Sequence, residues 1–261
     1  MAVAARNMLA AGRRHASLRV TAARTLRHAL STVSAGPTAS PLLEPPTPDG
    51  RLTVCLDMDE CLLHAEVADG AIKGCDQSHQ AHARAEERKD VAADFEFELP
   101  YLDAPVRVFK RPGLDDFLLE AGRVAELVLY TSAAEGYASE IVRRLDPTGA
   151  TFAGVLTRRH CRKLQTGSYA KDLAGLGRSL ERTVLVDDST TPFMMQPDNG
   201  IPITAFFGDP ADRDLLRVLH LLRHLHAEDE DVRPFLRQRF GVKEKLLERV
   251  GAMRSSNSRQ V

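Results

Sequence analysis

The chain has 261 residues, of which 43% are hydrophobic and 27% charged, a mixture typical of a folded domain rather than a disordered or fibrous chain. The formal net charge of −1 gives no general affinity for nucleic acid, and we expect no such partner. No apolar run approaches the roughly 18 residues of a membrane-spanning helix, so no such segment is predicted. The four cysteines form no CxxC pair, which argues against a zinc site or a disulfide scaffold.

Arginine and small or apolar residues dominate the first part of the chain. Residues 1–43 contain six arginines, no lysine and no acidic residue. This composition predicts an organellar transit peptide over residues 1–36, with a disordered basic tail as the alternative. Because arginine outweighs serine, we expect a mitochondrial location, in the matrix or at the inner membrane, rather than a plastid. Residues 37–50 contain five prolines and predict an extended linker, so the folded domain is expected to begin near Arg51.

Hydrophobic periodicity predicts alternating strands and helices from residue 52 onward. Short runs rich in Val, Leu and Ile predict buried strands, and broader amphipathic faces predict helices. Residues 68–94 lack an apolar period and are expected to form a solvated insertion. Strands are expected at residues 52–56, 95–99, 106–110, 126–132, 152–157, 182–190 and 201–206, and helices at residues 111–122, 134–145, 211–226 and 234–250.

This order of elements predicts an α/β fold, a three-layer sandwich with a mostly parallel central sheet. The strictly alternating segments FEFEL and VRVFK predict a small β-hairpin inserted after the first strand, and no large cap is expected. We expect one domain over residues 51–226. A helical C-terminal extension is expected over residues 227–261, with residues 251–261 frayed.

Acidic residues follow two of the predicted strands. Asp57 and Asp59 come directly after the first strand, and Asp187 and Asp188 end a later one. Because polar groups at the carboxyl ends of parallel strands gather at one edge of a sheet, the four carboxylates should converge. Like charges so close raise each other's pKa unless a cation neutralises them. The sequence therefore predicts a Mg²⁺ site, the alternative being that each acid caps a helix or faces solvent.

Hydroxyl and ammonium groups also lie close in sequence to the ends of predicted strands. A carboxylate beside a divalent cation is typical of phosphoryl transfer through an acyl-phosphate. Such a reaction needs donors and a positive charge for the equatorial phosphoryl oxygens. Thr131 and Ser132 end another strand, and Lys171 precedes the last acidic strand. We expect these three side chains to bind phosphate, although a single lysine is more often a solvated surface residue.

The motif DMDECLLH resembles the first motif, DxDx[TV], of the haloacid-dehalogenase-like superfamily. More narrowly, it is similar to the DLDETLVH motif of the aspartate-dependent phosphatases of the RNA polymerase II carboxy-terminal-domain family. The segments VFKRPGLDDFL, LYTSAAEGYA, SYAKDLAGLGRSL and VLVDDSTTPFMMQPDNGIPI continue the match in order, over residues 51–225. The resemblance implies a Mg²⁺-dependent phosphatase that forms an aspartyl-phosphate.

The resemblance also implies a role for each residue by position. Asp57 is expected to attack phosphorus. Asp59 is expected to protonate the leaving oxygen and then to deprotonate the hydrolytic water. The implied phosphate ligands are Thr131, Ser132, Lys171 and Arg159, and the implied Mg²⁺ ligands are Asp57, the Asp59 backbone carbonyl and Asp188, with Asp187 in support.

Three positions depart from the family pattern. Cys61 replaces the Thr or Val of the first motif, Asp188 replaces the Asn of DNSP, and Thr190 replaces its Pro. The added charge of Asp188 is expected to tighten Mg²⁺ binding and to repel phosphate. A nucleophilic Cys61 is disfavoured because Val67 stands where a C-x5-R loop needs arginine, so we expect a packed thiol. His64 is expected in the turn that leaves the first strand.

The segment between the first motif and YTS indicates the size of the substrate. Residues 65–105 provide a loop and part of a hairpin, too little for a folded lid, so an open cleft is expected. Such a cleft suits phosphoserine or phosphothreonine in an extended protein segment. His79 and His82 could pair as metal ligands, but they fall in the solvated insertion.

Two other functions stay open. A domain of this family occurs in the receptor subunit of the mitochondrial inner-membrane presequence translocase, often with altered catalytic acids, which makes a presequence-binding partner of the import machinery the main alternative. A phosphatase or phosphotransferase for small molecules, from the same superfamily, is the third possibility.

Overall fold

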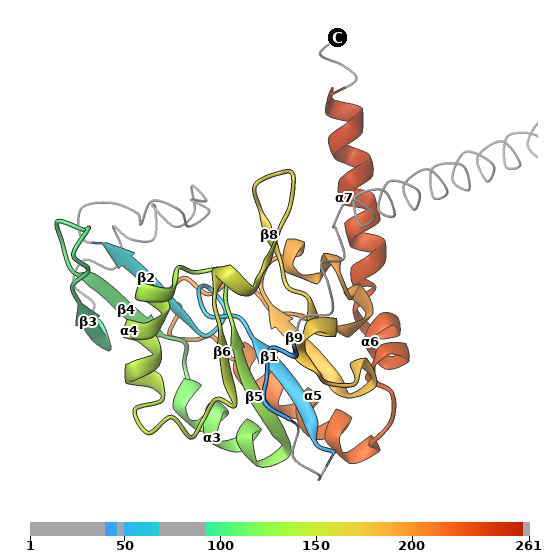
Figure 1. Cartoon of the computed structure of the whole chain (residues 1–261), viewed down its shortest axis with the longest axis horizontal. Helices are drawn as coiled ribbons and strands as arrows, with labels where there is room; N and C mark the ends of the chain where they lie inside the picture. Colours follow the sequence, from blue (N-terminus) through green and yellow to red (C-terminus); the bar gives the residue numbers. More distant parts are fainter. Residues whose placement is uncertain (1–39, 46–49, 68–91, 258–261) are drawn as a thin grey trace, which may run out of the picture.

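The structure is a computed structural model, which describes residues 40–45, 50–67 and 92–257 (Figure 1). The predicted transit peptide and the two insertion histidines, His79 and His82, lie outside the described residues.

A five-stranded sheet forms the centre of the domain, and all of its strand pairs are parallel. Strand β1 is the middle strand, with β9 and β10 on one side and β5 and β6 on the other (Figure 1). The predicted α/β fold with a mostly parallel sheet is therefore confirmed. The strands are β1 (Leu52–Leu56), β5 (Ala125–Tyr130), β6 (Gly154–Leu156), β9 (Thr183–Asp187) and β10 (Gly200–Pro202).

Alternation along the central strands divides their buried side chains between two faces. Val54 and Leu56 of β1 face the main hydrophobic core, whereas Cys55 between them belongs to a second core. The strands are apolar at almost every position because both faces of the sheet are covered. Four helices contribute to the main core: α3 (Leu114–Val124), α4 (Glu135–Leu145), α5 (Asp214–Glu228) and α6 (Val232–Phe240).

The second core is closed by segments from both ends of the described chain. Leu43, in the segment expected to be a linker, is buried there, and the backbone amide of Leu42 donates to Gly175 O at 3.0 Å. Helix α7 (Val242–Asn257) contributes Val242 and Leu246. The outer layer on this face consists of short 3₁₀ helices, residues 40–45 and the base of α7.

The C-terminal part differs from the single helix expected over residues 234–250. Gly241 adopts a left-handed conformation, with φ of 54°, and its amide donates to Arg237 O, which ends α6. Glycine adopts this backbone conformation without the steric cost that a Cβ atom adds. A new helix starts at Val242 and continues to Asn257, past the point where fraying was expected.

A small antiparallel sheet is inserted between β1 and α3, in the order β2-β4-β3. Pairing of β3 (Phe95–Phe97) with β4 (Val106–Lys110) confirms the predicted hairpin. Strand β2 (Leu63–Val67) was not predicted, and it pairs with the other edge of β4. His64 therefore lies within a strand rather than in the expected turn.

Among the residues that the structure describes, no helix is both long enough and apolar enough to span a membrane.

Candidate active site

The carboxyl ends of three neighbouring strands form the floor of the site. The central strand β1 pairs in register with both β5 and β9, so the three strands end at nearly the same level. Asp57 follows β1, Thr131 follows β5, and Asp187 is the last residue of β9. Parallel pairing thus brings together side chains that lie more than 50 residues apart in the sequence.

Lys171 lies between two of the carboxylates. Its Nζ donates to Asp57 Oδ1 at 2.5 Å and to Asp187 Oδ2 at 2.6 Å, and the side chain is 1% exposed. It follows the short strand β8 (Tyr169–Ala170), and its backbone amide donates to Pro192 O at 3.1 Å. Burial alone would lower the pKa of Lys171, but the Asp187 and Asp57 carboxylates raise it above its ordinary value, so the ammonium stays charged.

Three carboxylates are close enough to share one cation. Oxygens of Asp57, Asp187 and Asp188 lie within 4.8 Å of one another. The two oxygens of Asp187 already accept hydrogen bonds from Lys171 and from the amide of Ser189, at 2.6 and 2.9 Å. No described cationic side chain lies within ion-pair distance of Asp188. Asp57 and Asp188 are therefore the carboxylates that are best placed to hold a divalent ion.

Asp188 lies in a strongly acidic part of the cleft. Its enclosure, followed by the charges of Asp57 and Glu60, raises the pKa of Asp188 to about 7. Such crowding of like charges is what a bound dication would relieve. Oxygen donors with this charge fit a hard ion such as Mg²⁺.

Asp59 points to a different part of the cleft. Its carboxylate is not in the three-acid cluster, and Tyr137 Oη, from α4, donates to Asp59 Oδ1 at 2.6 Å. Enclosure and then the charge of Glu60 raise the pKa of Asp59 to about 8, while the Tyr137 hydrogen bond works in the opposite direction. A carboxyl group with this pKa carries a proton near neutral pH and can act as a general acid.

Hydroxyl groups and one guanidinium line the opposite wall. Thr131 Oγ1 accepts the Ala133 amide at 3.0 Å, which leaves the hydroxyl hydrogen available to a ligand. Ser132 also lines the cleft, and its carbonyl accepts from Arg158 Nε at 2.6 Å. The cleft has a volume of about 760 Å³ and is lined by Arg158, but not by the predicted Arg159.

Arg159 lies outside the cleft, where its guanidinium forms an ion pair with Glu135 at 3.3 Å. Of the predicted site residues, the structure brings all but Arg159 to the cleft. The two arginines are neighbours in a 3₁₀ helix over residues 158–160, and the sequence contains no signal that would tell which one faces inward.

Two further residues of the site were missed from the sequence. Tyr137 lies in the quoted segment LYTSAAEGYA, but its contact with Asp59 depends on how α4 packs into the main core. Arg111 is 1% exposed, donates to Cys61 O at 2.9 Å, and pairs with Asp212 at 2.8 Å. It therefore fixes the loop that follows β1, a role that only the fold reveals.

Cys61 is a packed residue, as expected. Its side chain is fully buried, and its Sγ lies 3.9 Å from Val186 O. Burial, followed by the Asp57 and Asp187 charges, raises the pKa of the Cys61 thiol well above its ordinary value. A thiol in this state is a poor nucleophile.

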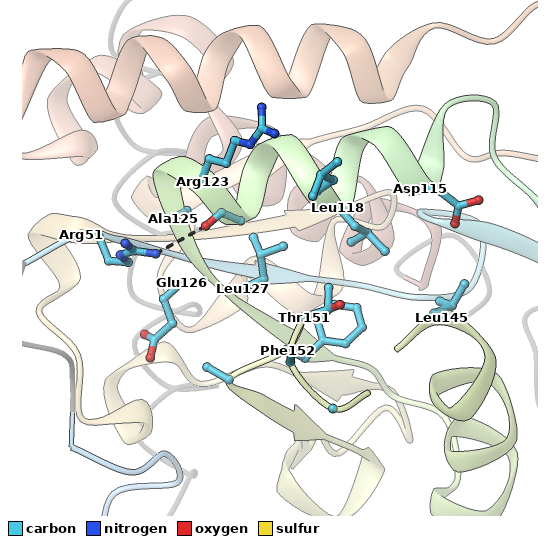
Figure 2. A pocket seen from close by; sticks show the side chains of 15 residues that line it. Arg51, Asp115, Leu118, Arg123, Ala125, Glu126, Leu127, Leu145, Thr151 and Phe152 are labelled. Carbon is cyan, nitrogen blue, oxygen red and sulfur yellow. Dashed lines mark hydrogen bonds between the residues drawn. The ribbon is translucent and has the colours of Figure 1, made fainter. Parts of the chain in front are cut away.

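A second hollow, of about 670 Å³, lies near the amino-terminal ends of β1 and β5 (Figure 2). Its floor is apolar, with Leu118, Leu127 and Phe152, and Arg51 at its edge donates to Gly122 O at 3.4 Å. The three-acid cluster lies at the other edge of the sheet, so the chemistry is assigned to the first cleft.

Comparison with known proteins agrees with this geometry. CTD small phosphatase-like protein 1 of Caenorhabditis elegans is 31% identical over 198 residues, 76% of this chain and 36% of that protein. Mitochondrial import inner membrane translocase subunit TIM50 of Yarrowia lipolytica is 37% identical over 132 residues, 50% of this chain and 28% of that protein. The chain thus spans about a third of the length of these relatives.

The fold is also shared with a solved structure. The structure of Fcp1, an essential RNA polymerase II CTD phosphatase, has a TM-score of 0.54 and 20% sequence identity, and the match covers 74% of this chain and 67% of that one. The family model described as NLI interacting factor-like phosphatase matches residues 52–233, which include the whole cleft floor. The chain therefore belongs to the NLI interacting factor-like phosphatase family.

Proposed function

We propose that this chain is a Mg²⁺-dependent phosphatase that forms an aspartyl-phosphate and acts on phosphoserine or phosphothreonine in proteins. One observation carries the proposal: the buried ammonium of Lys171 lies between Asp57 and Asp187, with Asp188 and the raised-pKa Asp59 in the same cleft. A nucleophile, a general acid and a positive charge for the phosphoryl group are thereby present in one cleft.

The first step forms the covalent intermediate. Lys171 holds Asp57 Oδ1, so Asp57 Oδ2 attacks phosphorus while the bond to the serine or threonine oxygen breaks. Asp59 donates its proton to the leaving oxygen. The Lys171 ammonium and the Thr131 hydroxyl stabilise the negative charge on the equatorial oxygens.

The second step returns the chain to its starting state. Asp59, now ionised, takes a proton from a water molecule whose oxygen attacks the phosphorus of the intermediate. The bond between phosphorus and the Asp57 carboxylate breaks, and inorganic phosphate leaves. The Tyr137 hydroxyl keeps Asp59 oriented in both steps by its hydrogen bond at 2.6 Å.

Asp57, Asp188 and the backbone carbonyl of Asp59 would hold Mg²⁺, with Asp187 in support. When bound, the ion supplies positive charge that offsets both the crowded carboxylates and the incoming phosphate. The donor set fits it because three carboxylates converge within 4.8 Å and the single buried ammonium does not balance their charge.

The shape of the cleft supports a protein substrate. Tyr101, on the loop between β3 and β4, lines the cleft and is 65% exposed. Arg158 and Tyr169 also line the cleft, and the guanidinium carbon of Arg158 lies 5.4 Å from the centre of the Tyr169 ring. One exposed and one partly exposed aromatic ring, together with a cation in the cleft lining, suit an extended peptide better than a small enclosed metabolite.

A second candidate function is a presequence-binding role in the mitochondrial import machinery. The similarity to the translocase subunit of Yarrowia lipolytica and the arginine-rich N-terminal sequence favour it, and they also support our proposal of a mitochondrial location. A fusion of residues 1–36 to a fluorescent protein should enter isolated mitochondria. Specific binding of presequence peptides by a chain without phosphatase activity would favour the import role.

The proposed reaction is tested with the purified full chain, p-nitrophenyl phosphate and a phosphoserine peptide. Activity should require Mg²⁺, disappear with EDTA, and be lost in Asp57→Asn. Asp115→Asn, an equivalent change on a side chain that is 70% exposed, should leave activity unchanged. Absence of turnover in the wild type, or normal turnover in Asp57→Asn, would refute the proposal.

A further inference from the structure

Helix α7 lies beyond the part of the chain that matches the family model, which ends at residue 233. It projects from the body of the domain, but its base contacts the 3₁₀ helix η4 (Thr191–Met194) (Figure 1). This 3₁₀ helix starts three residues after the metal-site carboxylate Asp188. An element outside the family domain therefore lies against the loop that carries part of the candidate active site.

One face of α7 makes this contact. Val242, Leu246 and Arg249 are spaced four and three residues apart, so they lie on the same side of the helix. Val242 and Leu246 are buried in the second core together with Phe193 of η4. Arg249 Nη1 donates to Thr190 Oγ1 at 2.6 Å.

The loop between β9 and η4 faces the cleft on one side and α7 on the other. Ser189 and Thr191 line the cleft, whereas the hydroxyl of Thr190 between them bonds to α7. The carbonyl of Pro192 accepts the backbone amide of Lys171 at 3.1 Å. The position of this loop therefore determines where the Asp188 carboxylate lies and where the backbone of Lys171 lies.

Phe193 of η4 has little freedom to shift away from α7. A Cβ atom at Gly200 of β10 would lie only 2.7 Å from the Phe193 ring, so the ring fills the space that this glycine leaves open. The loop is thus held between β10 on the inner side and the face of α7 on the outer side.

We propose that α7 is a positioning element of the active site, and that Arg249 is a positioning residue acting through Thr190. The contact holds the loop of residues 188–192 where Asp188 and Lys171 can both reach Asp57. This inference rests on the proposed phosphatase function and deepens it. Loosening the contact should weaken binding of the divalent ion and slow the chemical step, with little effect on substrate binding.

The test compares point variants of the full chain. Arg249→Ala and Thr190→Val each remove one partner of the hydrogen bond, and Arg249→Lys keeps a donor. Lys245→Ala is the matched control, since this exposed lysine of α7 makes no ion pair or side-chain hydrogen bond with another described residue. Two measurements are made: the rise in unfolding temperature as MgCl2 is added, and kcat and KM for p-nitrophenyl phosphate.

Arg249→Ala should weaken the apparent Mg²⁺ affinity and lower kcat by about two- to tenfold, the range for the loss of one hydrogen bond. KM should change less than twofold, Arg249→Lys should recover part of the loss, and Lys245→Ala should match the wild type. The double variant should be no worse than either single variant, because both remove the same interaction.

Two failures can be told apart. A wild type that shows neither Mg²⁺-dependent stabilisation nor activity overturns the proposed function, and with it this inference. A wild type that shows both, while Arg249→Ala behaves like Lys245→Ala in affinity and kcat, overturns the positioning role alone. Additive losses in the double variant would also overturn it.

Discussion

The metal-free chain should lose stability as the pH rises from about 4 to about 8, and Asp59 should be a main cause. The pKa of this carboxyl is 3.8 when it is free and about 8 in the folded chain. Between these values the folded state binds more protons than the unfolded state, so the free energy of unfolding decreases with rising pH. The contribution of Asp59 to stability is fully present below its pKa in the unfolded chain. This contribution is lost as the pH rises through the pKa of Asp59 in the folded chain.

The size of the effect follows from the two values. At about 1.4 kcal/mol for each pKa unit, their difference sets an upper bound of about 6 kcal/mol. Asp59 is only half-buried, and solvent screening in an open cleft reduces the interaction. We therefore expect Asp59 to account for about 2–3 kcal/mol of stability lost between pH 5 and pH 8.

The assay is urea unfolding at pH 5, 6, 7 and 8 in the presence of EDTA, for the wild type and Asp59→Asn. Circular dichroism is the signal of choice because the chain contains no tryptophan. Asparagine keeps the shape of the side chain and can accept the Tyr137 hydroxyl, but it cannot titrate. Its pH profile should be flatter than the wild-type profile by the stated amount, whereas Asp115→Asn should follow the wild type. Parallel profiles for the wild type and Asp59→Asn would refute the reasoning.

Three further outcomes are expected. Lys171→Met should lower kcat by about 100-fold or more, because it removes the cation aimed at the phosphoryl oxygens; a loss below tenfold in steady-state assays would contradict that role. Arg158→Ala should raise KM for a phosphopeptide by about tenfold, whereas Arg159→Ala should change this KM less than twofold. A larger rise of KM in Arg159→Ala than in Arg158→Ala would show that Arg159, not Arg158, faces the cleft. Gly177→Ala should reduce the free energy of unfolding by about 1–2 kcal/mol because the φ of Gly177 is 76°. Gly136→Ala should cause no such reduction, since a Cβ atom at Gly136 would meet only open space. Equal unfolding midpoints for the two variants would contradict this prediction.

The sequence is most informative where chemistry and periodicity coincide. The buried strands and the acids that end them are visible as apolar runs followed by polar residues, and parallel pairing then forces Asp57, Thr131 and Asp187 to one edge of the sheet. Lys171 was expected at the same point from the family resemblance, and the structure places it there. The positions of Asp57, Thr131 and Asp187 are dictated by the ends of the central strands, whereas Lys171 follows β8 of a separate two-stranded sheet.

Other features of the fold and the site depend on tertiary contacts, which cannot be predicted from the local sequence pattern. Strand β2 contains the polar residues His64 and Glu66, so it has a weak strand signal and forms because β4 offers a free edge. The orientation of Arg158 and Arg159 is decided within a single 3₁₀ turn. The break between α6 and α7 rests on Gly241, whose left-handed conformation cannot be distinguished from an ordinary helical glycine by sequence alone.

The ion pairs of Lys171 have a consequence for how the product leaves. Without substrate, the ammonium is already neutralised by Asp57 and Asp187, at 2.5 and 2.6 Å, so any anion that enters must compete with these internal carboxylates. Once hydrolysis frees Asp57, the restored negative charge of its carboxylate again balances the ammonium and favours release of inorganic phosphate. Product inhibition should accordingly be weak, and sulfate or phosphate in a buffer should occupy the cleft only at high concentration.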